Sequence, residues 1–597
     1  MNKQTLDGNQ FYKLFRSGVG TVVAQKEILN STNVFPVMDG DTGTNLMMTL
    51  TSILDETKIS SDFSVVINSI SDAAIENARG NSGAIFASFL NGFSKSCGHL
   101  KELTMEAFGL GVVKASNEAY ESVSHPVEGT MLTVIRVWAD FINKEYKFFA
   151  SFSDLFNEAY EKALITLEET PLHLEILNKY HVVDSGAKGF VYFLEGINSV
   201  SDETFLKENN NFEIGDFKKL SIVHNETEAF SAENRYCCEF TLKGKFEGRK
   251  TLGSFGDEIV ITGNQRVTKV HIHSNNPIGI TEFFIKESHF ISKAKVDDML
   301  LQVQVRNHQK SKIGILTDSI CDLPPALFEK YQIHMIALNV HSNNQTYLDK
   351  QTLNFDILSR LLESNSYPQS SQADVGQIKL KLDWMLMYYE SIIVVSVSSR
   401  LSGMFESYKK AIRVAKNNGK NITLIDSKLN SGAQGLLVLR AAELTLTNFT
   451  HEDIVQALNQ IAKKTRIFVS LDTFKYAVKS GRVPNIVGKF GMFLNLKPIM
   501  TLDDMGSGTA FGIALSTKGI NKKIEKLVKY IFVNEGIVDY AIVHAANFEM
   551  ATQYSERFIE ILGVSPKFVS EISSITAIHA GKGAVAIAFI KGDNCKE

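Results

Sequence analysis

The chain has 597 residues, 44% of them hydrophobic and 21% charged, which is ordinary for a globular protein and excludes a disordered or fibrous one. Its formal net charge of -4 gives no bulk attraction to nucleic acid, so no nucleic-acid partner is expected. Five cysteines do not indicate a disulfide framework, and no apolar run suits a signal peptide or a membrane span. We therefore expect a cytoplasmic multidomain protein that meets any lipid in solution or by peripheral contact with a membrane surface.

Residues 8–200 have the periodicity of helices, with apolar side chains recurring on one face at Ile135, Trp138 and Ile142. Short loops rich in glycine and polar residues separate these helices. They are residues 39–44 (DGDTGT), 79–83 (RGNSG), 128–131 (EGTM) and 184–189 (DSGAKG). Helices joined by such loops predict an all-α domain with a site at one end.

Two carboxylates lie two residues apart at Asp39 and Asp41, with Gly40 permitting a tight turn between them. Mg²⁺ prefers oxygen ligands and usually keeps phosphate oxygens in its shell. A lone Asp-Gly-Asp would more often be a turn at the start of a helix. The three further loops favour a metal site, because their backbone N–H groups can cradle phosphates.

Residues 33–45 (NVFPVMDGDTGTN) resemble the metal-binding signature of the DhaL family, the nucleotide-binding subunit of dihydroxyacetone kinases, in the variant of bacterial fatty-acid kinases. The other three loops match in the same order, so the resemblance covers residues 8–200. It implies an α-helical barrel that binds ATP through Mg²⁺. It implies Mg²⁺ ligands at Asn33, Asp39 and Asp41, and nucleotide contacts at Asn45, Asn81, Ser82, Gly83, Thr130, Met131, Asp184 and Gly186.

Residues 212–305 follow a polar linker and have a mixed pattern, with strands expected at 259–262 and 267–273. Side chains i and i+2 share one face of a strand, so His271 and His273 can converge. Together with Cys237 they would suit Zn²⁺. The residues alone equally permit a buried thiol and two strand histidines.

Residues 236–240 (YCCEF) and 269–277 (KVHIHSNNP) resemble the middle domain of fatty-acid kinases. The resemblance implies a small α/β domain with Zn²⁺ on Cys237, His271 and His273. Three protein ligands leave one position open, which suits an accessory or catalytic site as well as a structural one.

From residue 312 onward, short β-branched runs alternate with helical segments. The runs at residues 313–316, 392–397, 422–425 and 467–469 are each followed by small polar residues. This pattern predicts an α/β domain with a site at the carboxyl ends of parallel strands.

Residues 313–324 (IGILTDSICDLP) resemble the start of the DegV family of fatty-acid-binding proteins, and the resemblance extends over residues 312–592. Further matches are residues 370–372 (SSQ), 398–403 (SSRLSG), 425–427 (IDS), 480–482 (SGR), 497–498 (KP) and 579–584 (HAGKGA). The family implies two α/β lobes that enclose an acyl chain. It implies that the lipid carboxylate is bound by Ser370, by Ser398 or Ser399, and by the cations Arg482 and His579.

Together these resemblances predict ATP-dependent phosphorylation of a bound fatty acid to an acyl phosphate and ADP. A fatty carboxylate is already ionised near neutral pH and needs no general base, while Arg482 or His579 would stabilise the developing charge. The expected partners are the fatty acid, a second copy in a homodimer, and a separate DegV-type carrier or an acyltransferase that uses acyl phosphate. Two alternatives stay open: a kinase of a dihydroxyacetone-like compound, and a lipid-binding regulatory protein with an inactive kinase half.

Overall fold

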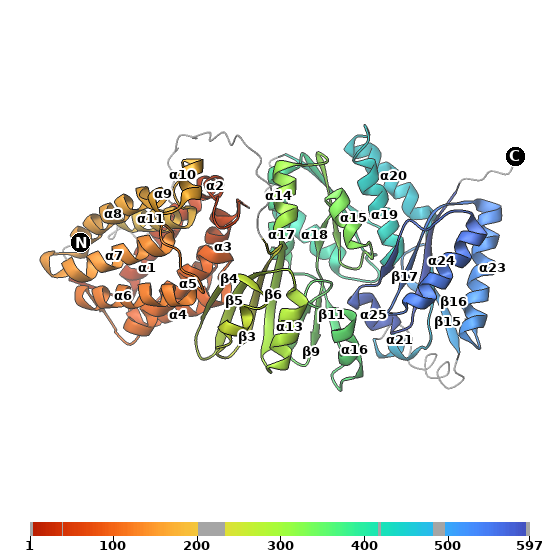
Figure 1. Cartoon of the computed structure of the whole chain (residues 1–597), viewed down its shortest axis with the longest axis horizontal. Coiled ribbons are helices and arrows are strands. Elements are labelled where there is room, and N and C mark those ends of the chain that lie inside the picture. The colour runs from red at the N-terminus through yellow and green to blue at the C-terminus, as the bar shows by residue number, and fades with distance from the viewer. Residues whose placement is uncertain (1–3, 39, 201–232, 416–418, 481–495, 593–597) are drawn as a thin grey trace. The chain divides into compact units, whose positions relative to one another are not determined.

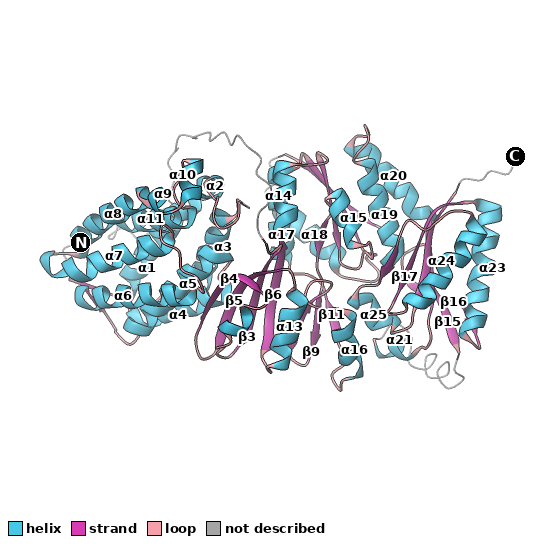
Figure 2. Ribbon diagram, viewed as in Figure 1, coloured by secondary structure: helices cyan, strands magenta, loops and turns pink. Residues whose placement is uncertain are grey.

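The computed structural model describes residues 4–38, 40–200, 233–415, 419–480 and 496–592. The chain folds into two compact units, Met1–Val303 (unit 1) and Gln304–Glu597 (unit 2). Figure 1 follows both units along the chain, and Figure 2 shows that the first part of unit 1 is mainly helical. Within the described ranges, every helix is too short or too polar to cross a membrane. The linker expected at residues 201–211 lies outside the described residues.

Helices build the first part of unit 1 (Figure 1). They are α1 Gly8–Ala24, α2 Lys26–Ser31, α3 Thr42–Glu56, α4 Phe63–Asn77, α5 Gly80–Cys97, α6 Met105–Ser122, α7 Met131–Glu145, α8 Phe152–Glu168, α9 Thr170–His173, α10 Glu175–Tyr180 and α11 Ser185–Asn198. A short antiparallel pair, β1 Thr5–Leu6 with β2 Leu103–Thr104, ties α1 to α6. The periodicity expected for α7 is confirmed, since Ile135, Trp138 and Ile142 are buried.

An aromatic core holds these helices together. Phe190 meets Phe89 and Trp138 edge to face, with ring centroids 5.8 Å and 5.6 Å apart. Such pairs contribute about 0.5–1.5 kcal/mol each beyond the area they bury. Glycine lets α11 approach α1 closely, because a Cβ added at Gly196 would lie 2.5 Å from the Ser17 carbonyl oxygen. This packing fixes the helix ends that carry the candidate site.

The second part of unit 1 is an antiparallel sheet with the strand order β4-β5-β3-β6. Its elements are β3 Tyr236–Lys243, α12 Arg249–Leu252, β4 Gly256–Gly263, β5 Val267–Ser274, α13 Pro277–Lys286, β6 Phe290–Asp298 and α14 Met299–Asn307. The strands expected at residues 259–262 and 267–273 are confirmed as β4 and β5. The β4–β5 register shifts between Asp257 and Val260, which marks a bulge.

Unit 2 begins with a parallel sheet in the order β13-β12-β7-β8 and a small antiparallel sheet in the order β10-β9-β11. The elements are β7 Ile313–Asp318, α15 Pro325–Tyr331, β8 His334–Ile336, β9 Asn339–Ser342, β10 Gln345–Leu348, α16 Phe355–Glu363, β11 Gln369–Ser371, α17 Val375–Tyr388, β12 Ser391–Ser396, α18 Met404–Val414, β13 Asn421–Asp426, α19 Ser431–Leu444 and α20 His451–Lys464. The parallel strands expected at residues 313–316, 392–397 and 422–425 are confirmed.

These two sheets and their helices form the first lobe of unit 2. A six-stranded sheet in the order β16-β15-β14-β19-β17-β18 forms its second lobe. Its elements are β14 Thr465–Ser470, α21 Lys475–Lys479, β15 Lys497–Leu502, β16 Gly508–Ala514, α23 Thr517–Glu535, β17 Ile537–His544, α24 Phe548–Leu562, β18 Val569–Glu571, α25 Ser574–Ala580 and β19 Val585–Lys591. The parallel direction expected for residues 467–469 is wrong, because β14 runs antiparallel to both β15 and β19. An apolar run that ends in polar residues marks a strand, but its direction depends on distant partners.

The close contact of α11 with α1 predicts a stability effect. Gly196→Ala should lower the free energy of unfolding of unit 1 by about 1–3 kcal/mol, because the new methyl group meets backbone atoms. Gly20→Ala on α1 is the matched control: a Cβ there meets nothing within 4 Å, so it should raise stability by up to about 1 kcal/mol. Urea unfolding followed by Trp138 fluorescence in a Trp384→Phe background measures both. Equal effects of the two substitutions would contradict the packing argument.

Candidate functional site

The four glycine-rich loops of unit 1 each lead into a helix, and the N-termini of α7 and α11 are joined directly. One Asp184 carboxylate oxygen accepts hydrogen bonds from the N–H groups of Met131 (3.0 Å) and Ala187 (2.7 Å). The start of α5 lies against the same place, since a Cβ on Gly186 would be 2.8 Å from the Ser82 Oγ atom. Burial raises the pKa of Asp184 to about 6, although both N–H groups favour its ionised form.

The N-termini of α3 and α5 also meet. The Thr49 hydroxyl of α3 accepts a hydrogen bond from the Arg79 N–H at 3.1 Å. Gly80 has a φ of +60° and lies so close to Asn45 that a Cβ would be 2.6 Å from the side-chain nitrogen. Gly83 is equally confined, because its Cβ would lie 2.6 Å from the Thr49 hydroxyl oxygen. Four helix N-termini therefore gather at one end of the helical part.

The electrostatics of these helix ends favour an anion, although the N-cap residues of α3 and α11 are themselves acidic, Asp41 and Asp184. None of α3, α5, α7 and α11 has an acidic residue in its first turn. The exposed N–H groups and aligned dipoles of helix N-termini attract negative charge, and phosphates above all. The loops that bring Asn45, Ser82, Gly83, Met131 and Gly186 together can therefore bind a polyphosphate.

Three of the residues predicted to bind metal or nucleotide hold the loops in shape. The Asn33 amide accepts a hydrogen bond from Thr42 and donates one to the Val37 carbonyl oxygen at 2.6 Å, which closes the loop before α3. The Thr130 hydroxyl donates to the Val127 carbonyl oxygen at 2.7 Å. Asp184 clamps two helices, as described above.

The acidic pair predicted to bind Mg²⁺ is described only in part. Asp41 is the N-cap residue of α3, without a side-chain capping hydrogen bond. Asp39 lies outside the described residues. The Mg²⁺ ligand set therefore stays a prediction.

A second cluster lies on the sheet of unit 1. The ligand atoms of Cys237, His271 and His273 are all within 4.8 Å of one another, as their strand positions predict. Both imidazoles are buried, and the Nε2 atom of His271 has no hydrogen-bond partner within the described part of the chain. Burial lowers the pKa of His271 to about 3 and that of His273 to about 4, so both rings are neutral near pH 7. Two neutral imidazoles and a thiol fit Zn²⁺, which would displace the thiol proton on binding.

Charged residues that no sequence motif singled out lie beside this cluster. Glu239 is 2% exposed, and its carboxylate lies 3.1 Å from the Lys269 ammonium and 4.0 Å from that of Lys295. Burial opposes its ionisation, but the two ammonium groups hold the pKa of Glu239 well below its ordinary value. The i, i+2 spacing from Cys237 already places Glu239 on the face of the thiol. That signal could have identified it.

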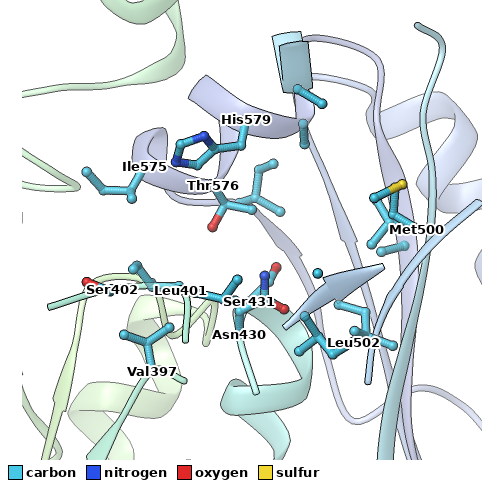
Figure 3. Close-up of a pocket in the computed structure, with 18 of the residues that line it drawn as sticks. Val397, Leu401, Ser402, Asn430, Ser431, Met500, Leu502, Ile575, Thr576 and His579 are labelled. Atoms are coloured by element: carbon cyan, nitrogen blue, oxygen red, sulfur yellow. The ribbon is translucent and has the colours of Figure 1, made fainter. Parts of the chain in front are cut away.

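Unit 2 contains a cavity of about 700 Å³ between its two lobes. Its walls are mainly apolar, with Val397 and Leu401 on one side and Met500 and Leu502 on another. Figure 3 shows Thr576 and His579 on α25 across the cavity from Leu401 and Asn430. The helices α18 and α19 begin at this cavity, where Gly403 and Ser431 line it. Their N-termini favour an anionic group in an otherwise apolar space.

Some of the residues predicted to bind the lipid carboxylate line the cavity, and others do not. Ser370 and His579 line it. Ser398 is buried and donates to the Gly506 carbonyl oxygen at 2.8 Å, whereas the exposed Ser399 donates to Asp426 at 2.6 Å. Neither of these two serines is among the described lining residues.

The arginine predicted for the cavity is not the one that the structure places there. Arg482 lies outside the described residues. Arg400 lines the cavity and was missed, although it stands inside the quoted motif at residues 398–403. A cation at this position could pair with an anionic ligand.

A buried charge network positions α25 and therefore His579. The carboxylates of Asp322 and Asp349 accept hydrogen bonds from the N–H groups of Ser573 (2.7 Å) and Ser574 (2.8 Å) at the start of this helix. The Lys350 ammonium lies 2.9 Å from Asp322 and compensates its charge. The network crosses from the first lobe to the second and fixes the cavity wall.

Three protein-family models match consecutive parts of the chain. Residues 36–199 match the DAK2 domain, residues 233–306 match the FakA-like middle domain of fatty acid kinase, and residues 312–592 match the DegV family. The chain therefore combines a helical kinase-type domain, a small sheet domain and a two-lobed α/β domain. It is a fusion of DAK2, fatty-acid-kinase-like middle and DegV domains.

Curated relatives match about half of the chain. An uncharacterised protein of Mycoplasma pneumoniae is 31% identical over 363 residues, which cover 56% of this chain and 64% of the relative. Protein YloV of Bacillus subtilis is 30% identical over 332 residues, which cover 52% of this chain and 59% of the relative.

Two of the solved structures that match this chain are DegV-family proteins. A DegV-family protein of Thermus thermophilus, titled for fatty acid binding, is 22% identical with a TM-score of 0.43 and covers 47% of this chain and 99% of its own. DegV of Bacillus subtilis, titled a fatty acid binding protein, is 25% identical with a TM-score of 0.42 and the same coverage.

The cluster of Cys237, His271 and His273 predicts a bound metal. We expect the purified chain to carry about one Zn²⁺ by inductively coupled plasma mass spectrometry. Cys237→Ser should lose the metal, because thiolate is the strongest ligand of the set. The matched control is Cys238→Ala, since the Cys238 thiol points to the other face of β3 and contacts the Tyr236 carbonyl oxygen. Wild-type protein that is metal-free without any chelator would exclude the site.

Proposed function

We propose that this chain transfers the γ-phosphoryl group of ATP to the carboxylate of a fatty acid, giving an acyl phosphate and ADP. The observation that carries the proposal is that one chain holds both a cluster of four helix N-termini in unit 1 and a large apolar cavity in unit 2. The first suits a polyphosphate, and the second suits a long acyl chain. Transfer within one chain and transfer between two chains are both compatible with this proposal.

The nucleotide half of the proposal is supported by the loops and by the family of the domain. The DAK2 match and the FakA-like middle-domain match fall on the parts that build this end of unit 1. We assign the phosphates to the N–H groups of the α5, α7 and α11 ends, and Mg²⁺ to Asp41 with Asp39. Mg²⁺, when bound, would neutralise phosphate charge during transfer.

The lipid half is supported by the size and lining of the cavity. Its volume of about 700 Å³ lies in the range of ligand sites, and apolar walls with few polar groups suit a chain that ends in a carboxylate. We assign the carboxylate to Ser370, Arg400 and His579, because hydrogen-bond donors and cations must offset its desolvation.

The chemistry needs positioning more than proton transfer. The carboxylate is ionised near neutral pH, so one of its oxygens can attack the γ-phosphorus directly. A new C–O–P linkage forms, the bond from the γ-phosphorus to the bridging oxygen breaks, and ADP leaves with the electron pair. The protein groups hold the two anions in line and reduce their mutual repulsion.

The reaction itself can be tested by trapping its product. Wild-type protein with MgATP, oleate and hydroxylamine should form oleoyl hydroxamate, which mass spectrometry detects. Asp41→Asn should abolish the product but keep bound lipid. It removes a carboxylate assigned to Mg²⁺ and leaves unit 2 unchanged. Phosphorylation of dihydroxyacetone without any hydroxamate from common fatty acids would instead support the small-molecule kinase.

The cavity geometry separates two serines that the sequence motifs treat alike. Ser370→Ala should weaken fatty acid retention roughly tenfold, the usual loss when a hydrogen bond to a charged group is removed. Ser399→Ala should leave retention unchanged, because its hydroxyl is bonded to Asp426. Native mass spectrometry after delipidation and titration with oleate compares the two. A larger loss in Ser399→Ala would contradict the assignment of the carboxylate to this cavity.

A further inference from the structure

Two carboxylates of the middle sheet contact the loop that starts α5. A Glu239 carboxylate oxygen accepts the N–H of Gly80 at 2.8 Å, and the side-chain nitrogen of Asn81 donates to Glu258 at 3.3 Å. Gly80 and Asn81 are the first two residues of α5. Each of these two residues is thus held by a different strand, Gly80 by β3 and Asn81 by β4. Both lie in the loop that is proposed to bind phosphate.

Glu239 is an unusual residue to bury for packing alone. Removing a carboxylate from water costs several kcal/mol unless partners compensate it, and apolar residues of similar volume often serve stability as well. Here the ammonium groups of Lys269 (3.1 Å) and Lys295 (4.0 Å) supply the compensating charge. An ionised acceptor makes a stronger hydrogen bond to a backbone N–H than a neutral one. The arrangement therefore fixes Gly80 firmly.

Glu258 reaches Asn81 through a strained backbone. Its φ of +49° lies in the left-handed region, which is strained for a residue other than glycine. It occupies the β4 bulge between Asp257 and Val260, and bulges redirect side chains. A carboxylate can only accept here, so the amide nitrogen of Asn81 must face it. The Asn81 amide oxygen is then left as a buried acceptor with no partner within the described residues.

We infer that Glu239 and Glu258 are positioning residues that hold Gly80 and Asn81 in the arrangement that receives the nucleotide phosphates. The middle domain is then part of the nucleotide site, although its two carboxylates touch the loop and not the phosphates. The inference rests on the proposed binding of ATP at these loops. It deepens that proposal by naming what keeps the first turn of α5 from fraying while its N–H groups await a ligand.

The test compares full-length variants by nucleotide affinity and by local hydrogen exchange. Glu239→Leu should raise the Kd for a non-hydrolysable MgATP analogue at least about tenfold, measured by calorimetry. Glu239→Gln should restore part of the affinity, because its amide oxygen still accepts the Gly80 N–H. In both cases deuterium uptake in peptides covering residues 79–86 should rise without nucleotide. Glu258→Gln, which keeps an acceptor for Asn81, should have the smaller effect.

Asn91→Ala is the matched control, because Asn91 also joins α5 to the sheet. Its side-chain nitrogen donates to the Gly263 carbonyl oxygen at 2.9 Å, about three helical turns beyond the loop. It should leave both the affinity and the exchange at residues 79–86 unchanged. Equal losses in Asn91→Ala and Glu239→Leu, or no rescue by Gln, would overturn the inference. Wild-type protein that binds no MgATP analogue would overturn the proposed function instead, and unchanged exchange in Glu239→Leu would overturn the positioning role by itself.

Discussion

The unpaired N–H groups of helix N-termini are the constraint on which unit 1 depends. Four helices direct these groups and their positive dipole ends to one place, and such ends repel each other without an anion between them. The Asp184 carboxylate relieves part of this repulsion by bonding the first turns of α7 and α11. Asp184 is buried, so this internal anion is part of the fold itself. The Gly80 N–H at the start of α5 is bonded by a second carboxylate, that of Glu239 on the sheet.

The sheet supplies a second group of charges from one face. Lys269, His271 and His273 alternate on β5, opposite Cys237 and Glu239 on β3, with Glu239 paired to His271 and Cys237 to His273. A face with this composition cannot be covered by an apolar layer without large desolvation costs. It is covered instead by the polar start of α5, through the Gly80 N–H. The candidate metal cluster and the loop that starts α5 are therefore neighbours, because Cys237 and the Glu239 that contacts this loop both lie on β3.

The sequence predicts the local elements of the fold and the candidate metal cluster. It does not predict features that depend on residues far apart in the chain. Helical periodicity located α7, and the i, i+2 rule brought His271 and His273 together, because both are local properties. The direction of β14 was mispredicted because it depends on β19, more than a hundred residues later in the chain. The contacts of Glu239 and Glu258 with α5 depend on how the helical part and the sheet of unit 1 pack against each other. No local pattern encodes that packing, although the bulge that aims Glu258 is itself a local feature.

In unit 2 as well, a local motif locates the cavity, but distant contacts decide which of its side chains line it. The motif at residues 398–403 placed its serines near a ligand, but the structure turns Ser399 to Asp426 and puts Arg400, which was not predicted, in the cavity wall. His579 is fixed from the opposite side, because α25 is held by backbone N–H groups bonded to Asp322 and Asp349. These carboxylates belong to the first lobe, whereas the helix belongs to the second. Separation of the lobes would break two buried hydrogen bonds to carboxylates, so these bonds hold the polar end of the cavity in place.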